Sequence, residues 1–107
     1  MSDVTMVRLP FRSRFREPMR CNVKLMTCRT EKMASPGDRF EAFGAVFEVT
    51  HVMRMRLGYV ASDCFLQEGC VSYQDFLDLW GRIHPTKGFD PEQIVWAHCF
   101  KQVEVRP

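Results

Sequence analysis

The chain has 107 residues and a mass of 12.6 kDa; 46% of its residues are hydrophobic and 26% are charged. These values fit one globular domain over residues 1–107 and exclude a disordered tail, a collagen-like repeat or a linker-dominated chain. No apolar run approaches the roughly 20 residues that a membrane-spanning helix needs, and the start, MSDVTMVRLP, lacks the apolar core of a signal peptide. We therefore expect a cytoplasmic protein, monomeric and not associated with a membrane.

The formal net charge of +2 hides an asymmetry along the chain. Residues 1–32 carry eight basic and three acidic side chains, a net charge of +5, whereas residues 33–107 carry seven and ten, a net charge of −3. Phe11 and Phe15 lie among the N-terminal arginines, and arginine with aromatic rings suits phosphate contacts and base stacking. On charge alone, this segment fits a surface that faces a polyanion as well as it fits an ordinary solvated surface.

The five cysteines indicate reduced thiols. They stand at positions 21, 28, 64, 70 and 99, without a Cys-x-x-Cys pair. Structural zinc sites usually contain such a pair. We therefore expect mostly buried, reduced cysteines that pack as small apolar residues, with no metal and no other cofactor.

Apolar residues spaced by four predict a short helix near the N-terminus. Phe11, Phe15 and Met19 form its stripe, and Pro10 suits its first turn. Pro18 predicts that the helix stops by Glu17 or is distorted there.

Alternation of apolar and polar residues predicts the strands, which cover residues 23–29, 39–43, 45–55 and 94–105. The alternation in the first is imperfect, which indicates a bulge at Met26. The second and third strands form a tight hairpin about Gly44. In the third, the alternation predicts that His51 points inward.

Two further helices are predicted between the hairpin and the last strand. The first covers residues 57–67 and ends at Gly69. The second begins at a capping box, Ser72 to Asp75, and runs to Ile83 with Phe76, Leu79, Trp80 and Ile83 facing the core. A last strand that returns after two helices predicts an α+β fold with a small, strongly curved or barrel-like sheet.

Three motifs in this order resemble those of the ASCH domain. They are Lys24-Leu-Met-Thr-Cys-Arg29, the turn Pro36-Gly37-Asp38 before a strand, and Glu68-Gly69-Cys70-Val71-Ser72 before a helix. ASCH domains are small β-barrels of the PUA-like superfamily with the hallmark Gly-x-Lys-x-x-x-x-Arg. The resemblance covers about residues 11–100. Asn22 stands where the family has glycine, and asparagine also tolerates a left-handed backbone.

The resemblance implies a PUA-like barrel of about five to six mixed strands with two to three flanking helices, and a cleft that takes a nucleobase or RNA. Some small bacterial members hydrolyse N4-acylated cytidines with a lysine, a threonine three positions later and a glutamate before the last helix. Lys24, Thr27 and Glu68 stand at these positions. The resemblance therefore implies that these three residues are catalytic.

The chemistry of the three side chains is coherent. A threonine hydroxyl needs an adjacent base, a lysine becomes one when burial disfavours its ammonium form, and a carboxyl group can protonate the leaving amine. However, positions 24 and 27 face opposite sides of a regular strand, so a bulge or an end-of-strand twist is required. The alternative is structural: Lys24 on the surface, Thr27 filling a pleat and Glu68 ending a helix.

Arg29 is the main candidate for ligand binding, because it shares a strand face with Thr27 and its guanidinium suits a phosphate or a base edge. Its alternative role is an ion pair with Asp38 or Glu41. Further candidates for contacts with RNA or a base are Arg12, Arg16, Arg20 and Tyr59.

Several functions stay open at this point. One is a module that binds RNA or a modified nucleobase without turnover, and another is an amidohydrolase acting on N4-acylcytidine. Ribonuclease activity is a variant supported only by the family. A different class is a non-catalytic protein-interaction or inhibitory protein, such as a phage or prophage accessory protein.

Overall fold

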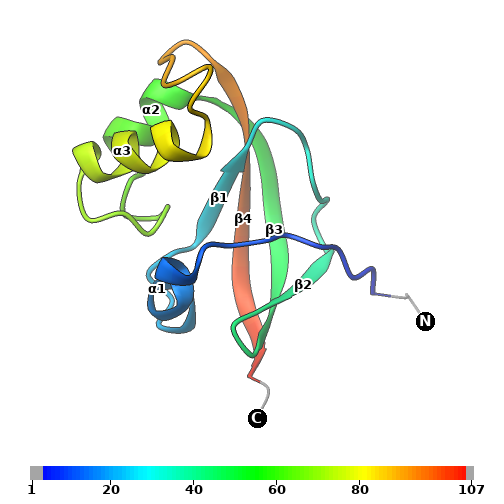
Figure 1. The fold of residues 1–107 in the computed structure, drawn as a ribbon. Helices are drawn as coiled ribbons and strands as arrows, with labels where there is room; N and C mark the ends of the chain where they lie inside the picture. The colour runs from blue at the N-terminus through cyan, green and yellow to red at the C-terminus, as the bar shows by residue number, and fades with distance from the viewer. Residues whose placement is uncertain (1–3, 106–107) are drawn as a thin grey trace.

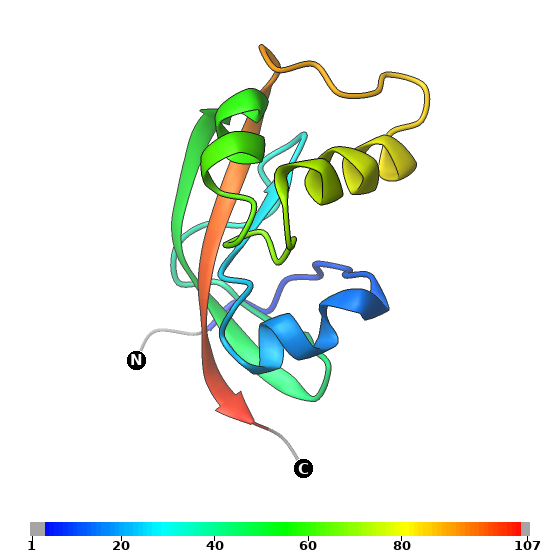
Figure 2. The ribbon, with the colours of Figure 1, turned by 90° about the vertical axis from the view of Figure 1, so that its left-hand side faces the viewer.

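A four-stranded antiparallel sheet is the frame of the protein in a computed structural model, which describes residues 4–105. The elements in chain order are η1 (Ser13–Phe15), α1 (Arg16–Arg20), β1 (Met26–Arg29), β2 (Arg39–Ala42), β3 (Ala45–Arg56), α2 (Leu57–Asp63), α3 (Tyr73–Ile83) and β4 (Ile94–Val105). The order in the sheet is β1-β4-β3-β2. Long strands β3 and β4 form its centre (Figure 1), and Figure 2 shows α1 and α3 on the same side of the curved sheet.

Two register shifts help to curl this sheet into a half-barrel. They fall between Val46 and Phe47 and between Val49 and His51 in the pairing of β3 with β4. An extra residue on one strand bends the sheet and reverses the facing of the residues that follow. The prediction that His51 points inward is therefore wrong: His51 is exposed, and Val52 packs against the core instead.

Phenylalanines fill the inside of the curl. Phe40 stacks on Phe47 at 5.4 Å between ring centroids, and Phe100 meets both rings edge-on at 5.4 and 5.5 Å. Phe11 of the N-terminal segment stacks on Phe40 at 5.5 Å. Because such rings carry large apolar areas, they tie the segment before α1 to the centre of the sheet.

The hairpin prediction is confirmed, and the last strand has the predicted bounds. Phe43 and Gly44 at the hairpin tip have φ of 52° and 74°, as a tight two-residue turn with positive φ requires. The predicted stop by Glu17 is wrong, because α1 continues to Arg20. Pro18 is the third residue of α1, where a backbone N–H has no acceptor within the helix, so proline costs nothing there.

The α+β class and the two to three flanking helices are confirmed, whereas the prediction of five to six mixed strands is wrong. Within residues 4–105 the sheet has four strands, all antiparallel, and one isolated parallel bridge joins Met6 to Arg39. The N-terminal segment pairs with the edge of β2 at this bridge and then crosses the core, so it does not become a fifth strand. None of the helices in the described range has the length and apolarity needed to cross a bilayer.

Candidate functional site

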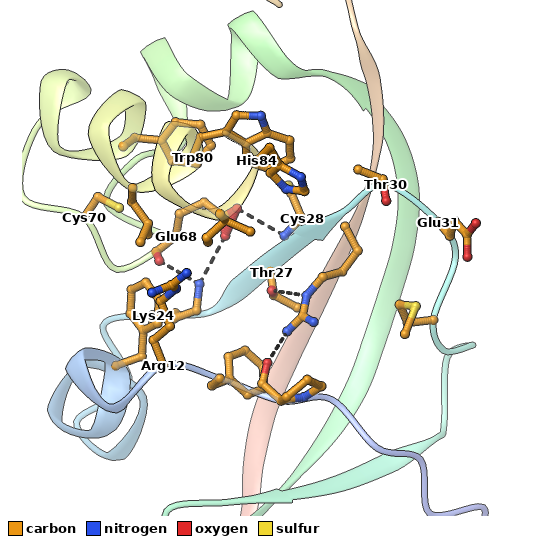
Figure 3. A pocket seen from close by; sticks show the side chains of 18 residues that line it. Arg12, Lys24, Thr27, Cys28, Thr30, Glu31, Glu68, Cys70, Trp80 and His84 are labelled. Atoms are coloured by element: carbon orange, nitrogen blue, oxygen red, sulfur yellow. Dashed lines mark hydrogen bonds and ion pairs between the residues drawn. The ribbon is translucent and has the colours of Figure 1, made fainter. Parts of the chain in front are cut away.

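A cavity of about 540 Å³ opens beside β1 (Figure 3). Its walls come from the segment around η1, from residues 24–33, from Glu68 and Cys70 after α2, and from α3. The α3 wall is largely apolar and aromatic, made by Phe76, Leu79, Trp80 and Ile83, and His84 follows it. The volume lies within the range of about 300–1,000 Å³ found for small-molecule sites.

The buried polar residues of the described chain gather at this cavity. They are Lys24, Thr27, Glu68 and His98, with 3%, 5%, 5% and 0% of their surface exposed. The first three line the cavity, and His98 lies behind Thr27 in the pairing of β1 with β4. Burying a polar group costs free energy unless it is hydrogen-bonded. The gathering of four such residues in one place therefore marks this cavity as the candidate functional site.

Lys24 and Glu68 form a buried ion pair. Lys24 Nζ lies 3.2 Å from Glu68 Oε2 and also donates to the backbone oxygens of Glu68 and Met26, at 2.6 and 2.8 Å. The ammonium lies 4.4 Å from the ring centroid of Phe15. Glu68 Oε1 accepts from the backbone N–H of Cys28 at 3.1 Å (Figure 3). Each charge is thus held by several partners inside the protein.

The turn after α1 delivers Lys24 to the cavity. Asn22 has φ 58°, a left-handed conformation that asparagine tolerates. The backbone N–H groups of Val23 and Lys24 then both donate to Pro18 O at 2.8 Å. Lys24 precedes β1, so the alternation rule does not apply to it. The strand pairs with β4 without a register shift, and the predicted bulge at Met26 is absent within residues 26–29.

Backbone conformation and close packing at position 69 both favour glycine after Glu68. Its φ is +85°, and a Cβ there would lie 3.0 and 3.1 Å from Cβ and Cδ of Lys24. The aliphatic stem of Lys24 therefore passes directly against the Gly69 backbone. Gln67 O accepts from the N–H groups of Leu25 and Met26 at 2.8 and 3.1 Å, which fixes this turn to the start of β1.

Thr27 and Arg29 share one face of β1. Arg29 Nε donates to Thr27 Oγ1 at 3.0 Å, and Nη2 donates to Pro10 O at 2.8 Å. The guanidinium lies 5.1 Å from the ring centroid of Phe11, and desolvation lowers the pKa of Arg29. Asp38, one of the ion-pair partners considered above, instead accepts from Ser35 N in its own turn.

His98 is a buried neighbour of the site that spacing alone did not reveal. Its Nε2 accepts from the backbone N–H of Met33 at 3.0 Å, so the neutral ring carries its proton on Nδ1, 3.3 Å from Thr27 O. Burial lowers the pKa of His98. The only sequence signal was its place in β4, whose register with β1 sets it opposite Thr27.

The cysteines at the site are free and poorly suited to nucleophilic chemistry. Cys28 and Cys70 are buried, Cys64 and Cys99 are partly buried and Cys21 is exposed, so the expectation of mostly buried cysteines holds for only two of the five. Desolvation raises the pKa of Cys28 well above its ordinary value and that of Cys70 to about 11. Both therefore stay protonated thiols at neutral pH.

The remaining predicted binding residues separate into two groups. Arg12 lines the cavity with Arg29. Arg16 and Arg20 pack on the hairpin tip instead, Arg16 over the ring of Phe43 and Arg20 donating to its carbonyl oxygen. Tyr59 is exposed on α2 and does not line the cavity.

Two further contacts involve α3, one within the helix at the cavity wall and one between the helix and η1. Trp80 lies between Phe76 and His84, at centroid distances of 6.0 and 4.3 Å, so it is both the predicted core residue and part of the cavity wall. Arg14, which sequence reasoning did not single out, pairs with Asp75 at 2.7 Å and links η1 to the first turn of α3.

A scan of family models and a search of curated proteins find no match for this chain. Solved structures do share its fold. The ASCH domain from Lactobacillus crispatus JV V101 has a TM-score of 0.65 and 15% identity over 94% of this chain and 80% of that one. Protein EF3133 from Enterococcus faecalis V583, of family DUF984, has 0.64 and 15% over 98% and 78%. Hypothetical protein PH0355 has 0.63 and 13% over 87% and 94%. Together with the Lys24, Gly37-Asp38 and Glu68-Gly69 motifs, these matches show that the chain has the fold of the ASCH domain.

Proposed function

We propose that the cavity binds a modified nucleoside and that Lys24, Thr27 and Glu68 hydrolyse its N4-acyl amide. The observation that carries this proposal is the gathering of buried polar side chains at one apolar-walled cavity. A buried lysine–glutamate pair contributes little net stability compared with apolar packing. Paired ionisable groups and a hydroxyl that line one cavity are, however, the components of an acyl-transfer site.

The reaction needs a proton to move within the pair first. Lys24 passes a proton to Glu68 across their 3.2 Å contact and becomes a neutral amine. It then takes the hydroxyl proton of Thr27 as Oγ1 attacks the acyl carbonyl carbon. The carbon–N4 bond breaks, Glu68 protonates N4, and cytidine leaves with the acyl group held as an ester on Thr27.

The same residues complete the cycle with water. Lys24 again cedes a proton to Glu68 and accepts one from a water molecule, whose hydroxide attacks the ester. Glu68 returns its proton to Thr27 Oγ1, and the acyl group departs as a carboxylic acid. No group is consumed, so each turnover uses one water per amide.

The walls suit a flat heterocycle. The aromatic and aliphatic side chains of α3 present faces on which a base can stack, and Trp80 is the largest of them. Arg12 is exposed where it lines the cavity, within reach of a ribose or an RNA backbone. We therefore include RNA that carries the modified base among the ligands of this site.

The test is to incubate the protein with N4-acetylcytidine and to measure cytidine by chromatography. Wild-type protein releases cytidine and Lys24→Ala does not. Lys101→Ala is the matched control, because Lys101 lies on β4 with a side chain that is 62% exposed. Absence of product at high enzyme concentration would reject the amidohydrolase.

Binding without turnover is the second candidate, and one observation favours it. All three N–H groups of the Lys24 ammonium already have acceptors, two of them backbone oxygens. An ammonium with all its donors in use inside the protein suits a static role. In that case RNA binds without being changed, with an affinity that falls steeply as salt rises, because phosphate contacts release counterions. Salt-independent binding, or none, would contradict this candidate.

A further inference from the structure

Arg29 brings to the cavity a positive charge that no direct ion pair with a described residue matches. Lys24 is matched by Glu68 at 3.2 Å. Among residues 4–105, by contrast, no carboxylate forms an ion pair with Arg29, although the side chain is half-buried and lines the cavity. A charge that is partly removed from water and lacks a counter-charge favours an anion or a strongly polar oxygen from outside.

The guanidinium also has unused donors. It carries five N–H groups in a fixed fork. Two of them are used, at Thr27 Oγ1 and at Pro10 O. Three N–H groups remain for a ligand, and two parallel ones suffice for a bidentate contact with a carboxylate.

We propose that Arg29 is a carboxylate subsite that holds the acid released from the acyl group. This inference rests on the proposed function and names where its second product binds. Arg29 Nε lies 3.0 Å from the oxygen of Thr27 to which the acyl group is transferred. When water cleaves that ester, the new carboxylate forms next to the guanidinium.

The charge and the walls favour a carboxylate over the dianion of a free phosphate. One unmatched positive charge suits a monoanion, and the nearby carboxylate of Glu68 opposes a second negative charge. The cavity wall also offers apolar side chains, Phe76, Leu79 and Met33 among them, against which the short alkyl part of an acid can pack.

The site is held in place before the ligand arrives. Pro10 O fixes Nη2 at 2.8 Å, and the ring of Phe11 lies against the guanidinium, while Phe11 itself stacks on Phe40 of the core. Preorganised donors bind without a further ordering cost. A consequence is product inhibition: acetate competes with the acylated substrate for the cavity.

The test is a titration of the protein with sodium acetate at constant ionic strength, followed by NMR on wild type and Arg29→Gln. Acetate binds wild type in the millimolar range and shifts the Arg29 Nε–H resonance. Arg29→Gln binds at least about tenfold more weakly, as expected for the loss of a charged hydrogen-bond partner. Arg54→Gln is the control, because Arg54 is exposed over the ring of Trp96 and does not line the cavity.

Each outcome decides the proposal. No acetate binding, or equal binding by Arg29→Gln, overturns it, and so does binding of inorganic phosphate in preference to acetate, which would assign Arg29 to a nucleotide phosphate. Should Arg29→Gln fail to fold, an unshifted Nε–H resonance in wild type still refutes it. The titration needs no turnover, so acetate binding without cytidine release keeps the carboxylate subsite and rejects the amidohydrolase.

Discussion

Replacing Gly69 with alanine tests how closely the Glu68 turn and Lys24 depend on each other. Alanine at φ +85° costs about 1–2 kcal/mol in backbone strain. Its Cβ would also stand 3.0 to 3.1 Å from the stem of Lys24 and from Cδ1 of Phe15. Crowding of this kind adds about 1–3 kcal/mol. We expect a loss of about 2–5 kcal/mol in the free energy of unfolding, together with impaired cytidine release, because the Lys24 side chain must move.

Alanine substitutions at two other glycines separate the cost of backbone strain from the cost of crowding. Gly37 has φ +94° with nothing within 4 Å of an added Cβ, so Gly37→Ala pays only the backbone cost of about 1–2 kcal/mol. Gly81 lies inside α3 with no neighbour in that range, so Gly81→Ala stabilises by up to about 1 kcal/mol.

Urea unfolding of the three variants measures these free energies. The order from most to least destabilised is Gly69→Ala, Gly37→Ala, Gly81→Ala. If Gly69→Ala cost no more than Gly37→Ala, the close contact between Gly69 and Lys24 would be refuted.

Three further predictions follow from the same contacts. Lys24→Met leaves the Glu68 carboxylate buried without its partner and lowers the free energy of unfolding by about 3–5 kcal/mol. The double variant Lys24→Met/Glu68→Gln recovers part of this loss. In a double-mutant cycle, strictly additive effects of the two substitutions would contradict the pairing. Because burial lowers the pKa of His98 below its ordinary value of 6.5, the folded state binds fewer protons than the unfolded state. Stability is therefore lost as pH falls below about 6.5. Urea unfolding at a series of pH values should show that the free energy of unfolding depends less steeply on pH in His98→Asn than in wild type. Equal slopes in the two proteins would exclude His98 as the cause. Asn22→Gly keeps the turn at φ 58° and changes stability by less than about 1 kcal/mol, whereas Asn22→Val destabilises the protein by about 1–2 kcal/mol. Thermal melts measure both effects, and equal melting temperatures for the two variants would argue against the left-handed turn.

Local signals predicted those parts of the fold that depend on neighbours in sequence. Ser72 caps α3 by accepting from Asp75 N, as the capping box predicts. The alternation over residues 94–105 gives β4 its bounds, and Gly44 gives the hairpin turn.

Features set by pairing between distant segments could not be predicted in this way. The bulge that exposes His51 depends on how β3 and β4 align, and the sequence of either strand does not encode it alone. The number of strands depends on whether the N-terminal segment pairs fully with β2, which a single bridge decides.

In the candidate site, too, local sequence signals and contacts between distant segments have to be distinguished. Spacing alone set Lys24 and Thr27 on opposite faces, and the resemblance to the ASCH domain brought them together with Glu68. In the structure Lys24 lies in a turn before β1, held by Pro18 O, and lines the same cavity as Thr27 and Glu68. Its ammonium pairs with Glu68, whereas Thr27 Oγ1 accepts from Arg29. The role of His98 behind Thr27 became visible only from the register of β1 with β4.

The most direct test of the proposed hydrolysis is the rate of cytidine release from N4-acetylcytidine by wild type, Thr27→Ser and Thr27→Ala. Thr27 Oγ1 lies in the cavity beside Arg29 Nε, and serine retains this oxygen while alanine removes it. We expect Thr27→Ser to release cytidine and Thr27→Ala to release none above the uncatalysed rate, with all three proteins folded by circular dichroism. Release by Thr27→Ala at the wild-type rate would contradict the assignment of Thr27 as the nucleophile.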